Sequence, residues 1–128
     1  MDDESLAFAR RLFDLAREGR AQELADYVDA GVPVDLTNDK GDTLLLLAAY
    51  APSPATVRVL LERGADPDRV NDRGQTALAA AAFRSSAQAV EALLEAGADP
   101  LRGSPDAVAT ARFFELPDMV ALLTRSDI

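Results

Sequence analysis

The sequence predicts an all-α solenoid of stacked helix-turn-helix units with β-turn fingers between them. Gly31, Gly64 and Gly97 recur at one constant interval, and turn, threonine and apolar positions keep the same interval. Ala and Leu dominate the apolar residues, while aromatic residues make up only 5% of the chain, a mix that favours helices. A repeat of roughly 33 residues indicates an array in which each unit buries its apolar faces against its neighbours.

The first unit is expected to contain two helices. Acidic and hydroxylic residues precede the first helix, so Ser5 or Asp3 is expected to cap it, and Gly19 ends it. The second helix is expected over residues 21–30, with Gly31 as its left-handed end. The side chains expected to face inward are Leu6, Phe8, Ala9, Leu12, Phe13, Leu15 and Ala16 in the first helix and Leu24, Tyr27 and Val28 in the second.

Two central units follow, each with a glycine-containing turn and two apolar segments. Residues 38–41 form a turn signal, after which Thr43 is expected to cap a helix. Pro54 suits the first turn of the next helix, where a backbone N–H would have no partner within the helix. The helices predicted for these units cover about residues 43–51, 55–63, 76–84 and 87–96.

The last unit is shorter than the others. Leu122 repeats Leu93, and Gly103 repeats Gly74. The interval within these pairs is shorter than the one that separates Gly31, Gly64 and Gly97. About four residues are therefore expected to be missing from the turn at residues 99–104. A shortened end unit with one neighbour suits a cap whose outer face tolerates water. The helices predicted for it cover about residues 105–114 and 117–125.

Four consecutive leucines, Leu44–Leu47, are too few to cross a membrane, which takes roughly 20 apolar residues. Successive helical residues point to different sides, so we expect these leucines to pack in the core. Leu44 or Leu46 is expected to be partly exposed on the inner face.

Charge and composition limit the classes of partner. The net charge of −9 argues against binding to nucleic acid or an anionic membrane, which need basic patches. The acidity either confers solubility or attracts a basic protein. The chain shows neither a secretory signal nor a long apolar run, so we expect a cytoplasmic protein. Arginine outnumbers lysine and alanine is abundant, which favours a GC-rich bacterial source.

An enzyme is not expected. The chain has no cysteine and no histidine, which removes thiolate chemistry and the commonest general base and metal ligand. It also lacks a glycine-rich phosphate loop and a nucleophile elbow. Asp66 and Asp68 lie in a predicted turn, where solvated carboxylates are expected, and the residues around them do not fit a calcium loop. We therefore predict no catalytic residue, no metal site and no cofactor.

Residues 71–78 supply a glycine-containing turn followed by threonine and leucine, and alanines at 81–82 follow. The unit continues with Val90, Leu93, Leu94, Gly97, Ala98 and Asp99. In this pattern the central units resemble the ankyrin repeat. The resemblance implies one ankyrin domain over residues 1–128, with repeats at about 4–37, 38–70, 71–102 and 103–126, the first and last being caps.

The chain departs from the family at the histidine that ties adjacent repeats, because Leu46 and Ala79 occupy its place. The family's Gly-His break is also replaced in both central units. The resemblance therefore implies an array that depends more on apolar packing between repeats and is less stable than a consensus array.

The resemblance also implies where a partner binds, namely at the finger tips and at the two residues after the alanine pair. The finger positions are Asp39, Lys40, Asp42, Asp72, Arg73 and Gln75. The positions after the alanine pair are Tyr50, Ala51, Phe83 and Arg84, with Arg17, Glu18, Arg112 and Phe113 in the end units. Aligned by repeat, one row across the inner face consists of Arg17, Tyr50, Phe83 and Arg112. Its two aromatic members either anchor a partner or only cover the alanine-rich helices.

We therefore predict a monomeric protein-interaction module that docks another protein on its concave face, as an adaptor, inhibitor or immunity-type protein. The short helices and the fingers are expected to line the concave face, and the longer helices to form the convex back. The alternative is a structural or self-associating repeat protein without a dedicated partner.

Overall fold

The computed structural model describes residues 2–51 and 53–125, which form eight α-helices and no β-strand. The predicted all-α solenoid is confirmed, and the helix boundaries lie within two residues of those predicted. The helices are α1 (Asp3–Glu18), α2 (Ala21–Asp29), α3 (Leu44–Tyr50), α4 (Pro54–Glu62), α5 (Ala77–Phe83), α6 (Ala87–Glu95), α7 (Ala107–Phe113) and α8 (Pro117–Leu123).

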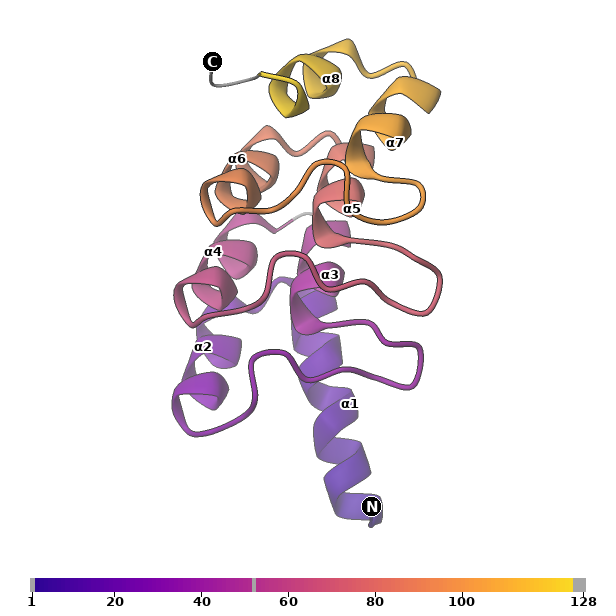
Figure 1. The fold of residues 1–128 in the computed structure, drawn as a ribbon. Helices are drawn as coiled ribbons and strands as arrows, with labels where there is room; N and C mark the ends of the chain where they lie inside the picture. Colours follow the sequence, from indigo (N-terminus) through magenta and orange to yellow (C-terminus); the bar gives the residue numbers. More distant parts are fainter. Residues whose placement is uncertain (1, 52, 126–128) are drawn as a thin grey trace.

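The helices stack in two layers (Figure 1). The inner helices, α1, α3, α5 and α7, pack on one another in sequence, and the outer helices, α2, α4, α6 and α8, do the same. Long loops lead from each outer helix to the next inner helix and project beside the inner layer. We call the tips of two of these loops, residues 38–43 and 71–76, the fingers.

Side-chain caps begin the inner helices. Thr43 Oγ1 accepts a hydrogen bond from the N–H of Leu46 at 3.0 Å, as predicted, and Thr76 and Asp106 cap α5 and α7 in the same way. The cap predicted for α1 is wrong, because Asp2 rather than Ser5 or Asp3 fills this role. Its carboxylate accepts from the Ser5 N–H at 2.7 Å, and this hydrogen bond lowers the pKa of Asp2.

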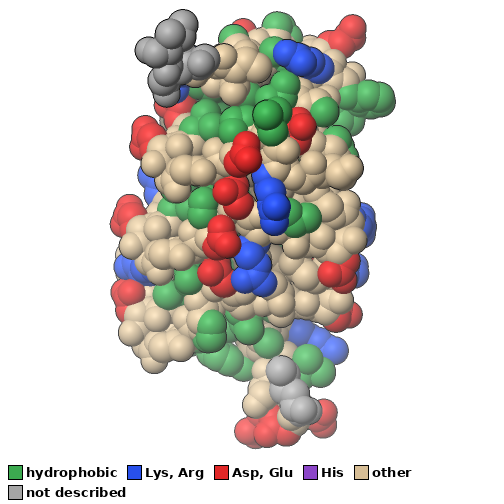
Figure 2. Space-filling view, in the orientation of Figure 1, with side chains coloured by type: hydrophobic (Ala, Val, Ile, Leu, Met, Phe, Trp, Pro, Cys, Tyr) green, Lys and Arg blue, Asp and Glu red, His purple; other side chains and the backbone are tan. Residues whose placement is uncertain are grey.

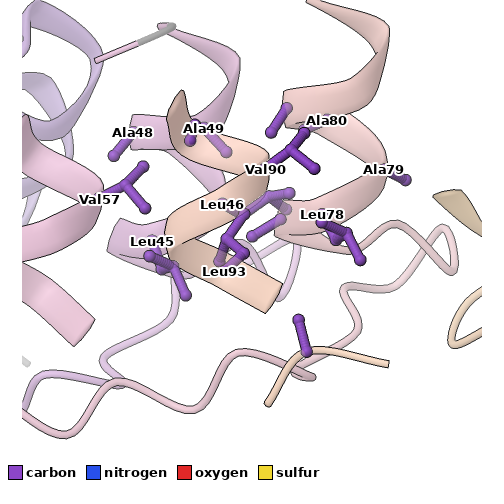
Figure 3. Packing of buried hydrophobic residues seen from close by; sticks show 14 of the residues in the cluster. Leu45, Leu46, Ala48, Ala49, Val57, Leu78, Ala79, Ala80, Val90 and Leu93 are labelled. Carbon is purple, nitrogen blue, oxygen red and sulfur yellow. The ribbon is translucent and has the colours of Figure 1, made fainter. Parts of the chain in front are cut away.

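The core runs through the whole stack and consists mainly of leucine, valine and alanine (Figure 3). Leu44 and Leu46 are only 0% and 3% exposed, so the expectation that one of them reaches the surface is wrong; Leu47 is the half-buried member of the run. Small alanines on α3 and α5 allow the inner helices to approach closely while the leucines fill the space between layers.

Three residues predicted to face the core are instead exposed: Leu6, Phe8 and Tyr27. The first half of α1 extends beyond the end of the stack, so no neighbouring helix pair covers it (Figure 1). Phe8 packs edge-to-face against Tyr27 with ring centroids 5.3 Å apart, which shields part of both rings. The apolar pattern of α1 therefore extends beyond the part of the helix that packs against the core.

Polar contacts tie neighbouring units together despite the missing histidine. The carboxylates of Asp35 and Asp68 each accept a hydrogen bond from a backbone N–H of the following unit, at 2.9 and 2.8 Å. Arg63 donates two hydrogen bonds to Asp29, which lowers the pKa of that carboxyl. Apolar packing is thus not the only link between units.

The helices of the last unit follow those of the third unit at an interval one residue longer than predicted. The cap Thr76 corresponds to Asp106, and the left-handed residue Ser85 corresponds to Glu115. Burial agrees, since Leu123 rather than Leu122 takes the fully packed place of Leu93. The equivalent of Phe83 is therefore Phe113, and the predicted row that ends at Arg112 is shifted by one residue.

Two glycines with the same backbone conformation give a test of how closely the units approach. Gly97 and Gly103 both have φ of +93°, but a Cβ on Gly103 would lie 2.8 Å from the Gly74 carbonyl oxygen, whereas Gly97 has open space. We expect Gly97→Ala to cost about 1 kcal/mol for the left-handed conformation alone. Gly103→Ala should cost about 1–3 kcal/mol more because of the backbone clash.

Chemical denaturation of both variants measures the difference. Equal unfolding free energies for Gly97→Ala and Gly103→Ala would show that the turn before α7 is not packed against the preceding finger as described.

Candidate functional site

An exposed aromatic cluster lies where α5 and α7 meet. Phe83 is the last residue of α5. Phe113 is the last residue of α7, and Phe114 follows it. The Phe83 and Phe114 rings pack edge-to-face with centroids 4.9 Å apart, and Phe114 contacts Phe113 similarly at 5.0 Å. The side chains of Phe83, Phe114 and Phe113 are 43%, 49% and 79% exposed. Burying such rings against a partner would remove much apolar area from water.

A hollow of about 240 Å³ opens beside this cluster. Two small residues, Ala79 and Ala80, contribute to its lining, and Figure 3 shows Ala79 pointing away from the core cluster. Three successive inner helices and two loops contribute to the wall. The other lining residues are Tyr50, Gln75, Phe83, Pro105, Thr110 and Phe114, so the lining contains no charged side chain.

Asn71 organises the fingers through four hydrogen bonds. Its Oδ1 accepts from the backbone N–H groups of Arg73 and Gln75, at 3.0 and 2.9 Å. Its Nδ2 donates to Asp42 Oδ1 at 2.7 Å and to Gln75 Oε1 at 2.8 Å. Gln75 Nε2 then donates to the Tyr50 hydroxyl at 3.0 Å. This chain links both fingers to the edge of the hollow.

A second link between the fingers is made by the backbone. The N–H of Asp72 donates to the Lys40 carbonyl at 3.0 Å, and the N–H of Ser104 donates to the Gly74 carbonyl at 2.9 Å. The fingers are therefore held by each other as well as by the helices, and their tips are arranged before any partner arrives.

Comparison with known proteins bears on this arrangement. A family model described as ankyrin repeats in three copies matches residues 12–103, more than half of the chain. The chain belongs to the ankyrin repeat family. A Pseudomonas aeruginosa protein with an ankyrin repeat name is 46% identical over 59 residues, which are 46% of this chain and 34% of the relative. The matched stretch thus spans about a third of that relative's length.

The family assignment confirms the resemblance inferred from the sequence, and the structure divides the predicted ankyrin contact positions into two groups. Asp42 and Gln75 are half-buried and hydrogen-bonded within the finger network, and Tyr50 is half-buried beside them. Asp42 and Gln75 thus hold the fingers in place, whereas Tyr50 also lines the hollow. The exposed positions are Arg17, Glu18, Asp39, Lys40, Asp72, Arg73, Phe83, Arg84, Arg112 and Phe113.

The predicted ankyrin row is only partly brought together. Tyr50 and Phe83 line the same hollow. Arg17, on α1, lines a neighbouring hollow together with Tyr50 and pairs with Asp14 at 3.1 Å. Arg112 lines two other surface hollows, together with residues of α8. The continuous part of the surface therefore runs from Arg17 through Tyr50 and Phe83, and Arg112 lies outside it.

Phe114 is the member of the cluster that the sequence analysis does not identify. The interval between Leu93 and Leu122 places Arg112 and Phe113 after the alanine pair, whereas the observed displacement, one residue longer, places Phe113 and Phe114 there. The correspondence between the caps Thr76 and Asp106 is the sequence signal that could have found it.

The loops between the helix pairs present charges of both signs. Figure 2 shows acidic and basic side chains interspersed along the middle of one face, where these loops run in Figure 1. Asp66 and Asp68, predicted to be solvated turn carboxylates, accept hydrogen bonds from the backbone N–H groups of Asp68 and Asp99. These two carboxylates stabilise the turns.

Within residues 2–51 and 53–125, no group of three or more acidic, histidine or cysteine side chains is arranged to hold a metal ion. In the same part of the chain, no helix combines the length and apolar character needed to cross a membrane.

Proposed function

We propose that this ankyrin array binds another protein through the surface formed by the fingers and the ends of the inner helices. The observation that carries the proposal is the exposure of Phe83, Phe113 and Phe114 together on one part of the surface. Clustered exposed apolar side chains mark interaction sites, because solvation of such a patch is unfavourable. Ankyrin repeats in general act as protein-interaction modules, which supports the same conclusion.

The proposed mechanism is docking on a preformed surface. The fingers are tied by the Asn71 network and by backbone hydrogen bonds, so little conformational entropy is lost when a partner binds. Aromatic anchors provide the apolar contact, and the finger tips Asp39, Lys40, Asp72 and Arg73 provide polar contacts at its rim. We propose an adaptor, inhibitor or immunity-type role in a bacterial cytoplasm, carried out without catalysis.

We further propose that the helix pairs are four repeats of one domain, at about residues 4–37, 38–70, 71–102 and 103–126. Each division leaves one inner and one outer helix in a repeat and falls in a connecting loop. The first and last repeats are caps, since each packs against a neighbour on one side only.

Removing the two edge-to-face rings should abolish binding while leaving the fold intact. In affinity capture from the native host, Phe83→Ala combined with Phe114→Ala should lose the partner retained by the wild type. Titration of that partner should show a loss of at least about 2 kcal/mol, or about thirtyfold in affinity. Phe8→Ala is a matched control, because Phe8 is also 43% exposed but lies on α1.

Equal capture by the double variant and the wild type would overturn the proposal. Melting curves distinguish loss of contact from loss of folding, since both rings are about half exposed and their removal should disturb the core little.

Self-association is the second candidate, favoured by apolar side chains exposed at both ends of the stack. Leu6, Phe8 and Tyr27 lie at the first end, and Leu101, which is 70% exposed, lies toward the other. Stacking one copy on the next would extend the array. Sedimentation at several concentrations tests this: a monomer at all concentrations excludes self-association, and reversible growth that Phe8→Ala suppresses supports it.

A further inference from the structure

The hydrogen bonds of the finger network fix the role of the Tyr50 hydroxyl. Two backbone N–H groups point at Asn71 Oδ1, so the other terminal atom of this side chain is nitrogen and must donate. It donates to Gln75, and the receiving atom is therefore the amide oxygen of Gln75. The remaining Gln75 atom is nitrogen, and it donates to Tyr50. The direction of each bond is set by the backbone and leaves no free choice of amide orientation.

The Tyr50 hydroxyl consequently accepts one hydrogen bond and keeps its own O–H for another acceptor. Among residues 2–51 and 53–125, no side chain or backbone oxygen accepts a hydrogen bond from it. The hydroxyl belongs to a residue that lines the 240 Å³ hollow, together with Ala79, Phe83 and Phe114. The hollow thus combines largely apolar walls with the oriented O–H of Tyr50.

We propose that this hollow receives a single uncharged apolar side chain of a partner protein, while the Tyr50 O–H donates to an oxygen of the same segment. The inference rests on the proposed function and names the chemistry of the segment that binds. Its lining carries no charged side chain, and α3 and α5 contain none, so an apolar side chain is complementary to it. A basic side chain, which the net charge of −9 would attract to the protein as a whole, is not complementary to this uncharged lining.

The size of the hollow favours a side chain over a free small molecule. Its volume of about 240 Å³ is below the roughly 300–1,000 Å³ typical of small-molecule sites. A backbone carbonyl next to an inserted side chain supplies an acceptor for the Tyr50 O–H, because every residue of a peptide carries one. Leucine, methionine or phenylalanine has the apolar character that the Ala79 and Phe83 surfaces require.

The probe for this proposal is a random peptide library displayed on phage and selected on the wild-type protein. Selected peptides should share a large apolar residue, and one of them is then titrated calorimetrically against the variants. Tyr50→Phe removes the O–H donor, together with the acceptor of Gln75 Nε2, and should weaken binding about fivefold, the usual value of one hydrogen bond. Ala79→Met fills the hollow and should weaken binding about tenfold or more. Arg10→Ala, at an exposed position of α1, should bind like the wild type.

Several outcomes overturn the inference. These are a selection that yields no binding peptide, peptides without a large apolar residue, and unchanged affinity for Tyr50→Phe in a protein whose melting curve shows it folded. Competition of the peptide by a free apolar amide, with loss of affinity only in Ala79→Met, would instead indicate a small-molecule site.

The same titrations separate this inference from the proposed function. If Phe83→Ala weakens peptide binding while Tyr50→Phe and Ala79→Met do not, the surface binds protein but the hollow is not used as proposed. If all three variants bind normally and Arg58→Ala on α4 does not, the peptide uses the outer helices, and the proposed function fails as well.

Discussion

Replacing Leu78 with alanine is expected to lower the free energy of unfolding by about 3 kcal/mol. Leu78 lies on α5 in the centre of the array and is 1% exposed. Its truncation removes buried apolar atoms and leaves a cavity that the surrounding residues of α3, α5 and α6 cannot fill by relaxing, which typically costs about 2–5 kcal/mol. Since small domains have only about 5–15 kcal/mol of stability, this change is a large fraction of the total.

Urea denaturation followed by circular dichroism measures the effect. Leu101→Ala is the matched control, because that leucine is 70% exposed and its loss should change stability by less than about 0.5 kcal/mol. Because stability in a stacked array is nearly a sum of unit and interface terms, a central defect should also broaden the transition. Identical midpoints for the two variants would contradict the described core.

Replacing Asn71 with alanine is expected to cost about 2 kcal/mol or more. Asn71 is 8% exposed, and all four of its hydrogen bonds would be lost together. Two backbone N–H groups, the Asp42 carboxylate and the Gln75 amide would each lose a partner, and partly buried polar groups left unpaired are costly. Asp72→Ala is the control, because that exposed neighbour contributes only its backbone N–H to the network.

An Asn71→Asp substitution distinguishes loss of shape from loss of a donor. The aspartate keeps the oxygen that accepts from Arg73 and Gln75 but places a second oxygen 2.7 Å from the Asp42 carboxylate. At neutral pH the two like charges should make this variant at least as unstable as Asn71→Ala. Acidification should restore part of the loss, because protonating one carboxyl removes the repulsion and supplies a donor. A variant as stable as the wild type at neutral pH would contradict the network.

The sequence predicts the fold well because its boundary signals are local. Thr43 caps a helix through its own hydroxyl, and Pro54 starts one through its fixed φ, so neither depends on distant residues. The alignment of the last unit fails for the opposite reason. The position of Gly103 is set by the packing of its turn against Gly74, whereas the start of the next helix is set by the cap at Asp106. The two features repeat at different intervals, so no single interval aligns both.

The site is less accessible from sequence because its contacts cross between units. Asn71 is predicted as a turn residue, but its bond to Asp42 depends on the distance between two fingers. Exposure of Phe8 and Tyr27 depends on how far α1 extends beyond the stack, which a periodic pattern does not define. Composition likewise gives a net charge, but not the absence of charge from the hollow.

Hydrogen–deuterium exchange, measured with and without the protein captured from the native host, locates the binding surface on the array. If the fingers and inner-helix ends form the binding surface, the partner should slow exchange in residues 38–43, 71–76, 79–84 and 110–115. The outer helices α2, α4 and α6 should exchange at the same rate in both states. Slowed exchange confined to those outer helices, with unchanged fingers and α5–α7, would contradict binding at the fingers and the inner-helix ends.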